Sequence, residues 1–336
     1  MKSLLYIGNK LSVHGYTQTT IETLGPLFES EGYKVYYASS KKNKAIRFLD
    51  MLLKTLQFRS EISYVIIDTY STSNFWYAFA VSQLCRILKL QYIPILHGGN
   101  LPERLKKNPR ISGMIFNNAY KNVAPSNYLM HHFKDANIKN LVYIPNSIEI
   151  ENYPFKIREN IGPKLLWVRS FAKIYNPKMA VDVFNSIKKI YPDAKLCMVG
   201  PEKDGSLEET KMHANNLKLD VYFTEKLSKK EWIKLSEEYD LFLNTTHFDN
   251  MPVSVIEAMA LGMPVISTNV GGIPFLLEDK ITGVLVNDND EKKMSEEIKN
   301  LTENSQFAKS LTHNARGLAE SFDWKEVKIS WMKILI

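Results

Sequence analysis

Short apolar runs alternate with longer segments of helical periodicity along the whole chain, and this alternation limits its folds more than any other feature. Residues 64–70, YVIIDTY, form a continuous apolar run, as in a parallel strand that is buried on both faces. Residues 43–58, NKAIRFLDMLLKTLQF, have instead the spacing of a helix. Further strand-like runs occupy residues 3–8, 34–39, 91–99, 141–148, 164–170, 194–200, 220–225, 240–246, 264–268 and 283–286. Strands that alternate with helices at this spacing predict parallel, doubly wound sheets.

A polar segment with two prolines, EIENYPFKIRENIGPK at residues 149–164, interrupts this rhythm. A chain of 336 residues is long for one domain and comfortable for two. We therefore expect an α/β protein with two doubly wound, Rossmann-like domains that face each other across a cleft. The first would span residues 1–153 and the second residues 162–318, and a helix within 319–336 would pack back toward the first. Ligands of such sheets bind beyond the carboxyl ends of the strands, so the residues that follow strands are the informative ones.

The net charge of +7 is concentrated in the first half of the chain. Residues 1–153 carry 18 lysines and arginines against 10 acidic residues, whereas the remainder carries 25 against 26. A basic half could face a nucleic acid, an anionic membrane or an acidic ligand. No recognised nucleic-acid-binding motif accompanies the charge, so we expect no nucleic acid partner.

The cysteines and the apolar runs bear on where the protein acts. Cys85 and Cys197 lie far apart and match no metal or redox spacing, so we expect reduced thiols in a cytoplasm. The N-terminus, MKSLLYIGNK, is better explained as a buried first strand than as a signal peptide. No run approaches the ~20 apolar residues of a membrane span.

The stretch NTTHFDNMPVSVIEAMALGMPVISTNVGG, residues 244–272, places Asp249 and Glu257 eight positions apart. Pro252 suits the first position of a helix that ends at Gly262. Asp249 and Asn250 then lie at the helix N-terminus, where backbone N–H groups are unsatisfied. Acidic residues at a helix start also suit the macrodipole without any ligand, so this feature is weak when it is taken alone.

The same stretch closes on Gly271 and Gly272, in a tight loop that opens another helix. Such a loop can bring backbone amides close to a phosphate, although a Gly-Gly pair is usually only a turn. The carboxylates and the glycines together, in one strand–helix–strand–loop–helix unit, indicate an anionic ligand much more specifically than either feature does.

The segment DNMPVSVIEAMALGMPVISTNVGGIP resembles the donor-binding signature of the family 4 glycosyltransferases. Their pattern is an acidic residue, Gly-Phe-Pro, four residues, Glu-Ala-Met, and later a Gly-Gly-Ile-Pro loop. Further similarity lies in VAPSNYLMHHF, VYIPNSIEIENYPF, WVRSFAKIYNPKMAVDVF and FDWKEV. The resemblance implies a retaining enzyme of the two-Rossmann B-type glycosyltransferase fold. It also implies that the first domain binds the acceptor and the second binds the nucleotide-sugar.

The resemblance assigns roles in the second domain. Glu257 would bind the ribose of a nucleotide-sugar. Asp249 would contact sugar hydroxyls, and Arg169 would neutralise the leaving diphosphate, as a guanidinium is suited to do. Donor contacts are implied for Lys173, Lys226, Asn250, Met251, Pro252, Gly271 and Gly272.

In the first domain, His97 in ILHGGN takes the position of a histidine near the transferred sugar. Gly15 in VHGYT takes the first-loop glycine position, where the backbone approaches phosphate and acceptor. His97, Arg169 and Asp249 are therefore the expected catalytic residues. The chain departs from the family pattern where Asp249 replaces a Glu and where Phe275 replaces another, and Lys173 comes one residue early.

The resemblance implies a metal-independent glycosyltransferase with no cofactor other than its donor substrate, a UDP- or GDP-sugar. The acceptor would be a glycan or a lipid-linked glycan, in polysaccharide, lipopolysaccharide or glycolipid biosynthesis. A non-catalytic nucleotide-sugar-binding subunit stays open because of the departures at Asp249 and Phe275. A non-hydrolysing epimerase is a second alternative, disfavoured by Arg169 and the Asp249–Glu257 pattern. A dehydrogenase is least favoured, since YIGNKLSVHG lacks Gly-x-Gly-x-x-Gly.

The helix expected at residues 43–58 places Ile46, Leu49, Leu53 and Leu56 on one stripe, with lysines and arginines around it. One interpretation is a Rossmann helix that buries the stripe and has a solvated basic rim. The other is contact with an anionic membrane surface, at the inner face of the cell membrane. The basic segment PERLKKNPR, residues 102–110, is either a solvated loop or a contact for an anionic acceptor.

Overall fold

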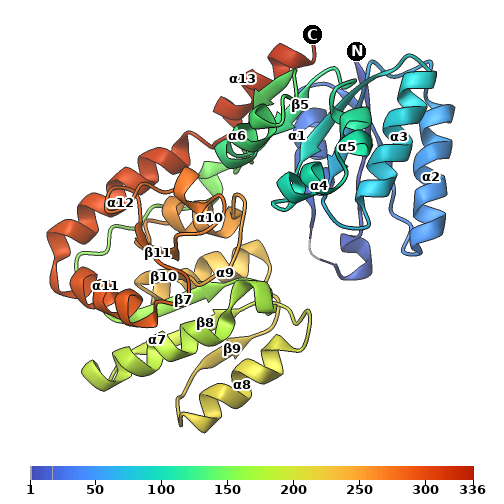
Figure 1. The fold of residues 1–336 in the computed structure, drawn as a ribbon. Helices are drawn as coiled ribbons and strands as arrows, with labels where there is room; N and C mark the ends of the chain where they lie inside the picture. Colours follow the sequence, from blue (N-terminus) through green and yellow to red (C-terminus); the bar gives the residue numbers. More distant parts are fainter. Residues whose placement is uncertain (1, 17) are drawn as a thin grey trace. The chain divides into compact units, whose positions relative to one another are not determined.

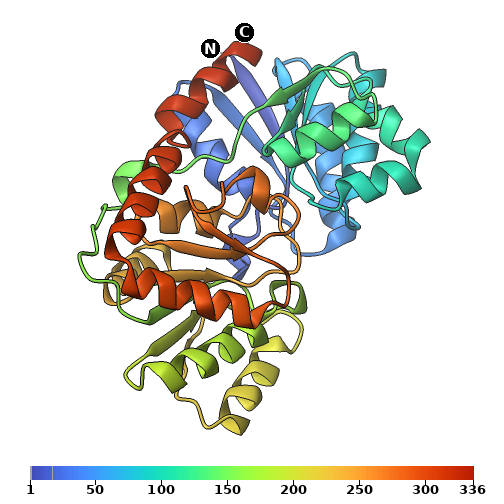
Figure 2. The ribbon, with the colours of Figure 1, turned by 60° about the vertical axis from the view of Figure 1, so that its left-hand side comes forward.

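The computed structural model describes residues 2–16 and 18–336, and it divides the chain into two compact units. Unit 1 comprises residues up to Ser147 together with Val327–Ile336, and unit 2 comprises Ile148–Glu326. Each unit contains a six-stranded parallel sheet with helices on both sides (Figures 1 and 2). The expected fold class, two doubly wound α/β domains, is confirmed at this level. No helix in the described part of the chain is long and apolar enough to cross a membrane.

Unit 1 alternates strands and helices as the sequence predicts. Its strands are β1 (Ser3–Ile7), β2 (Lys34–Ala38), β3 (Tyr64–Thr69), β4 (Gln91–Leu96), β5 (Asn122–Ala124) and β6 (Leu141–Tyr143). Its helices include η1 (Ser12–His14), α1 (Thr20–Ser30), α2 (Lys44–Gln57), α3 (Phe75–Ile87), α4 (Leu101–Lys107), α5 (Pro109–Phe116) and α6 (Asn127–Asp135).

The sheet of unit 1 has the order β2-β1-β3-β4-β5-β6, and all its pairs are parallel. Every residue of β3 is buried, because apolar side chains of flanking helices cover both faces of the sheet. The strand order reverses between β1 and β3, so the carboxyl ends of these two strands flank the crevice where such folds bind ligands.

Unit 2 repeats the pattern. Its strands are β7 (Lys164–Val168), β8 (Lys195–Val199), β9 (Tyr222–Thr224), β10 (Leu241–Asn244), β11 (Val265–Thr268) and β12 (Val284–Val286). Its helices include η2 (Ile150–Asn152), η3 (Lys173–Tyr175), α7 (Pro177–Ile190), α8 (Ser206–Asn216), α9 (Lys229–Leu235), η4 (Ser236–Glu238), α10 (Val253–Ala260), η5 (Ile273–Phe275), α11 (Glu291–Glu303) and α12 (Ser305–Glu320).

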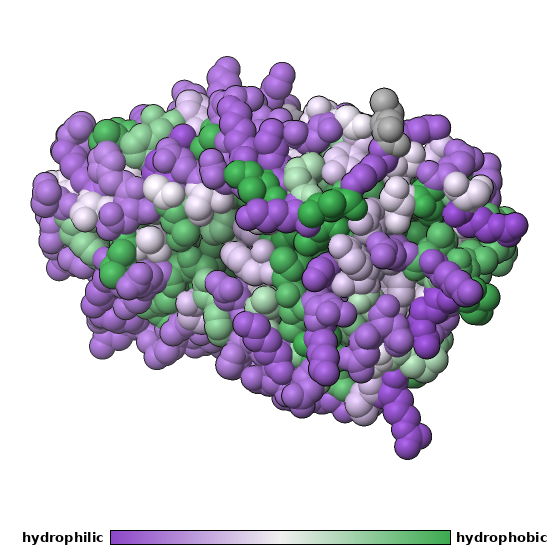
Figure 3. Space-filling view, turned by 90° about the horizontal axis from the view of Figure 1, so that it is seen from above, coloured by the Kyte–Doolittle hydropathy of each residue, from purple (hydrophilic) through white to green (hydrophobic). Residues whose placement is uncertain are grey.

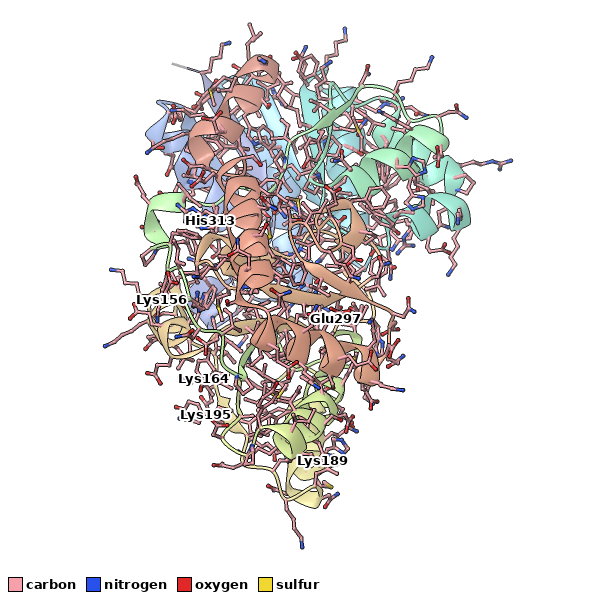
Figure 4. All side chains as sticks on the ribbon, turned by 90° about the vertical axis from the view of Figure 1, so that its left-hand side faces the viewer. Lys156, Lys164, Lys189, Lys195, Glu297 and His313 are labelled. Atoms are coloured by element: carbon pink, nitrogen blue, oxygen red, sulfur yellow. The ribbon has the colours of Figure 1, made fainter. Side chains whose placement is uncertain are left out.

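The sheet of unit 2 has the order β12-β11-β10-β7-β8-β9, so its order reverses between β7 and β10. One apolar cluster joins α7, α8 and α11 to the sheet, and a second joins α9 and α10. Lys164 and Lys195 pair at the amino ends of β7 and β8 and are labelled in Figure 4. The opposite ends of the strands lead into the residues that the sequence analysis selects.

The segment between the sheets belongs to unit 2, where Arg158 holds it. Its buried guanidinium donates to the carbonyl oxygens of Ser236, Tyr239, Leu261 and Gly262, at 2.8–3.2 Å. Burial lowers the pKa of Arg158. The division between the units therefore follows Ser147, and residues 148–162 pack with the second sheet.

The last helix, α13 (Trp324–Ile334), enters unit 1 at Val327. Trp331 packs edge-on against Phe28 of α1, and Lys328 forms a 2.9 Å ion pair with Glu31. The carbonyl oxygens of Leu335 and Ile336 accept hydrogen bonds from Lys2 and Tyr64, respectively. The end of the chain is therefore an integral part of the first unit.

Two local expectations need correction. The segment at residues 102–110 is not a solvated loop: it forms most of α4 and the start of α5, with Leu101 and Leu105 buried. Pro252 is the N-cap of α10 and not its first residue, since its extended backbone (ψ 115°) places it just outside the helix.

Candidate functional site

Two side chains meet at the reversal point of the second sheet. Arg169 follows β7 directly, Asp249 lies in the loop after β10, and their side chains form an ion pair. The guanidinium also lies 4.6 Å from the ring centroid of Tyr175. These two charged side chains are only 17% and 15% exposed, and burial lowers the pKa of Arg169. A permanent cation is thus held at the place where doubly wound sheets bind ligands.

The Gly271–Gly272 turn packs directly against the loop that carries Asp249. The amide of Gly272 donates to the carbonyl oxygen of Asp249 at 2.8 Å. A Cβ on Gly272 would lie 1.9 Å from the carbonyl oxygen of Asn250, so no larger residue fits there. Gly271 has a left-handed backbone, φ +54°, and a Cβ there would lie 2.3 Å from the carbonyl oxygen of Asp249. These glycines therefore shape the loop beside Arg169, together with the buried Asn250 and Met251.

Glu257 lies on α10 and is almost completely buried, with 2% of its surface exposed. Its carboxylate accepts a 2.8 Å hydrogen bond from the hydroxyl of Tyr153 and forms an ion pair with Lys229, the first residue of α9. Loss of water around its ammonium lowers the pKa of Lys229 to about 8, although 54% of its side chain is exposed. Both partners were missed by the sequence analysis, which selected Lys226 three residues earlier.

The two lysines that were predicted to contact the donor, Lys173 and Lys226, lie in exposed positions. The ammonium of Lys173 is 3.9 Å from Glu209, and its backbone amide donates to Asp204. Lys226 lies in the exposed loop between β9 and α9. No hydrogen bond or ion pair that the structure records joins Lys173 to Arg169, Asp249 or Glu257.

In unit 1, His97 follows β4 and contacts a buried aspartate. Its Nε2 lies 2.9 Å from Oδ1 of Asp68, whose carboxylate also accepts the hydroxyl of Tyr6 at 3.0 Å. Asp68 is fully buried at the end of β3, and its Oδ2 faces Gly8, at the end of β1. The sequence analysis did not select Asp68, which lies within the apolar run of residues 64–70, and Asp68 is the residue that positions His97.

Gly15 ends η1 with a left-handed backbone, φ +84°, and a Cβ there would meet no atom within 4 Å. The turn conformation, rather than crowding, therefore favours glycine at this position. Gly15 and His97 belong to unit 1 and the other predicted residues to unit 2, so the structure describes two separate groups.

One carboxylate pair has the Asp-x-Asp spacing of some metal sites, which the sequence analysis overlooked. Asp288 pairs with His247 at 2.9 Å, and Asp290 caps α11 through the amide of Lys293. Within residues 2–16 and 18–336, no three His, Cys, Asp or Glu side chains are grouped so that they could hold a metal ion.

The second half of the chain matches a known family. The family model described as "Glycosyl transferases group 1" matches residues 149–318. An uncharacterized glycosyltransferase of Methanocaldococcus jannaschii is 25% identical over 302 residues, which cover 82% of this chain and 76% of that protein.

Solved structures share the fold over the full length. A crystal structure of Anabaena HepE in complex with UDP has a TM-score of 0.78 at 17% identity and covers 100% of this chain and 99% of its own. HepE has also been solved with UDP-glucose. Sucrose-phosphate synthase from Thermosynechococcus elongatus has a TM-score of 0.82 at 14% identity, and the match covers 99% of this chain and 98% of that protein.

Proposed function

This chain belongs to the group 1 glycosyltransferases, and from that membership we propose a retaining enzyme that moves a sugar from a nucleotide-sugar to a glycan or lipid-linked acceptor. The observation that carries the proposal is the pairing of Arg169 with Asp249 at the reversal point of the second sheet. We further propose that the reaction belongs to envelope polysaccharide, lipopolysaccharide or glycolipid synthesis and takes place in the cytoplasm.

The chemistry needs positive charge more than it needs a nucleophile. The bond between the anomeric carbon and the diphosphate breaks, and the acceptor oxygen bonds to the same face of that carbon. The acceptor proton passes to the departing phosphate oxygen. Because negative charge grows on the leaving diphosphate, a preorganised guanidinium stabilises the transition state more than the bound substrate. Arg169 supplies this charge, which supports a reaction without a metal ion.

Glu257 and Lys229 are proposed to bind the nucleotide. The buried carboxylate of Glu257, which already accepts from Tyr153 and Lys229, is well suited to accept a hydrogen bond from a ribose hydroxyl. The neighbouring ammonium of Lys229 is well suited to contact a phosphate. The resemblance of the fold to HepE, which was solved with UDP and UDP-glucose, supports a uridine nucleotide as the first donor to test.

His97 is proposed to contact the transferred sugar. Its Nε2 lies 2.9 Å from a carboxylate oxygen of Asp68, which can only accept, and in the tautomer that places the proton on Nε2 the Nδ1 atom would accept a sugar hydroxyl. Asp68 acts through His97 and is therefore a positioning residue.

A panel of UDP-, GDP-, ADP- and CMP-sugars tests the proposal by thermal shift and by release of free nucleotide. We expect one donor to stabilise the protein and to be hydrolysed slowly. Glu257→Gln should bind that donor at least ~10-fold more weakly, because a charge-assisted hydrogen bond contributes about 1.5–3 kcal/mol.

Glu297→Gln is the matched control for the donor panel. Glu297 on α11, labelled in Figure 4, is also buried. Its carboxylate also pairs with a lysine, Lys293, at 2.9 Å. It lies outside the proposed site, so the variant should bind donor like the wild type. Binding without any nucleotide release, even with membrane extract as acceptor, would favour a binding subunit instead. A shift with none of the donors would exclude the proposed function.

The lowered pKa of Lys229 predicts a pH dependence of donor binding. Lys229 loses its charge as the pH rises through about 8, and its contact with the donor phosphate weakens. The dissociation constant of the nucleoside diphosphate should therefore rise by up to about tenfold per pH unit above this point. Lys229→Arg should remove the dependence, since arginine stays charged. Equal pH profiles for both proteins, measured by calorimetry, would contradict the contact.

A further inference from the structure

Helix α2 presents an apolar face to solvent. The four side chains of the stripe predicted from the sequence are exposed: Ile46 by 55%, Leu49 by 56%, Leu53 by 62% and Leu56 by 39%. The expectation that a Rossmann helix would bury this stripe is wrong. In Figure 1, α2 lies beside α3, and Figure 3 shows hydrophobic residues at the surface on the same right-hand side.

The inner face of α2 explains this orientation. Arg47, Met51 and Thr55 are buried against the unit. The guanidinium of Arg47 donates to the carbonyl oxygens of Lys41 and Lys42, at 2.8 and 3.0 Å, and Thr55 donates to the carbonyl oxygen of Met51. The guanidinium of Arg47 and the hydroxyl of Thr55 thus have hydrogen-bond partners on the buried side of α2. A rotation of the helix that buried the stripe would expose Met51 and break the hydrogen bonds of Arg47.

Basic residues surround the ends of the stripe. Lys41, Lys42 and Lys44 are exposed at the start of α2, and Arg59 is exposed just beyond its end. The first turn has no acidic residue. Lysines at a helix N-terminus oppose the macrodipole, so helix stability does not explain their position. An anionic surface beside this end of α2 would account for it.

The loop of η1 extends this surface. His14 contacts the carbonyl oxygen of Ser40 at 2.9 Å, which places the loop beside Lys41. Val13, the neighbour of His14, is 74% exposed. One further apolar side chain, that of Val13, therefore reaches solvent beside the basic start of α2.

We propose that the exposed face of α2 docks unit 1 on an anionic lipid membrane. The leucines and isoleucine enter the boundary between headgroups and acyl chains, while the lysines contact lipid phosphates. This surface goes beyond the proposed transfer reaction, and it would bring the loop that holds Gly15 to the membrane where a lipid-linked acceptor lies.

A second copy of the chain fits this face less well. In a parallel pair of α2 helices, the three lysines of each copy would meet, and in an antiparallel pair they would meet Arg59. Both arrangements bring like charges together. In addition, four side chains on one helix offer much less than the ~800 Å² per partner of a typical stable interface.

Cosedimentation with vesicles tests the proposal. The wild type should bind vesicles of phosphatidylcholine and phosphatidylglycerol in equal parts and not vesicles of phosphatidylcholine alone. Leu49→Ser with Leu53→Ser should weaken binding at least ~10-fold, because two inserted side chains are lost. Replacing Lys41, Lys42 and Lys44 with glutamine should weaken it about a hundredfold, from about 1 kcal/mol per lysine.

The matched control removes exposed apolar side chains elsewhere. Ile190 and Met212 in unit 2 are 51% and 62% exposed, and Ile190→Ser with Met212→Ser should bind vesicles like the wild type. All variants should keep the thermal shift with donor, so loss of membrane binding is separable from failure of the proposed function. The proposal would be overturned if the wild-type protein did not cosediment with anionic vesicles. The proposal would also be overturned if the wild type formed a dimer in solution and Leu49→Ser with Leu53→Ser abolished that dimer.

Discussion

Arg169→Ala should slow glycosyl transfer by about 10²–10³-fold, the typical effect of removing one preorganised donor from a developing negative charge. Arg169 is the cation that the fold holds at the reversal point of the second sheet, beside Asp249 and the ring of Tyr175. The loss should appear mainly in kcat, because charge on the diphosphate grows as the bond to the sugar breaks. Single-turnover release of nucleotide from the donor found in the panel measures it.

Three further variants separate charge, geometry and position. Arg169→Lys should recover only part of the rate, because one ammonium does not reproduce a planar fork of donors. Asp249→Asn should keep Arg169 in place through a neutral partner and should affect the rate less than Arg169→Ala. Lys173→Ala should have a small effect, since its ammonium lies near Glu209. An Arg169→Ala enzyme with nearly normal kcat would contradict the assigned role.

The alternation of strands and helices was predictable because it follows from the local spacing of apolar residues along the chain. Continuous apolar runs such as YVIIDT become buried parallel strands, and the interrupted spacing between them becomes helices. The family pattern then led to Arg169, Asp249 and Glu257, and unit 2 places the first two in contact. Their roles remain proposals, which the variants above test.

What the sequence did not predict depends on pairing in space. Lys229 reaches Glu257 because β9 leads into α9 beside α10, and no spacing in the chain carries that information. Asp68 meets His97 only because β3 and β4 are neighbours in the sheet. The stripe of α2 has an ideal helical period, but the period does not say which face is buried; the contacts of Arg47 decide it.

Arg158→Ala should destabilise unit 2 by about 3–5 kcal/mol, the usual cost of removing one member of a buried charged network. The truncation would leave the carbonyl oxygens of Tyr239 and Gly262 without this donor, inside a region where Arg158 is only 6% exposed. The carbonyl oxygen of Ser236 would keep only the backbone amide of Tyr239 as a donor. It would also leave Asp240, whose pKa burial raises, without its nearest cation at 3.9 Å. Thermal denaturation should show a midpoint lower by roughly 10 °C for a unit of this size.

Lys156→Ala is the matched control for Arg158, two residues away in the same segment. Lys156, labelled in Figure 4, is exposed. Its ammonium donates to the carbonyl oxygen of Glu237 at 2.8 Å, and its loss should cost no more than about 0.5 kcal/mol. Arg158→Lys should recover little, because a lysine cannot reach four carbonyl groups in different directions. Because this guanidinium ties the middle of the segment at residues 148–162 to unit 2, Arg158→Ala should also make the segment more accessible to protease than Lys156→Ala does. Equal midpoints and equal cleavage rates for the two variants would show that apolar packing of Ile148 and Tyr153, and not Arg158, holds the segment in place.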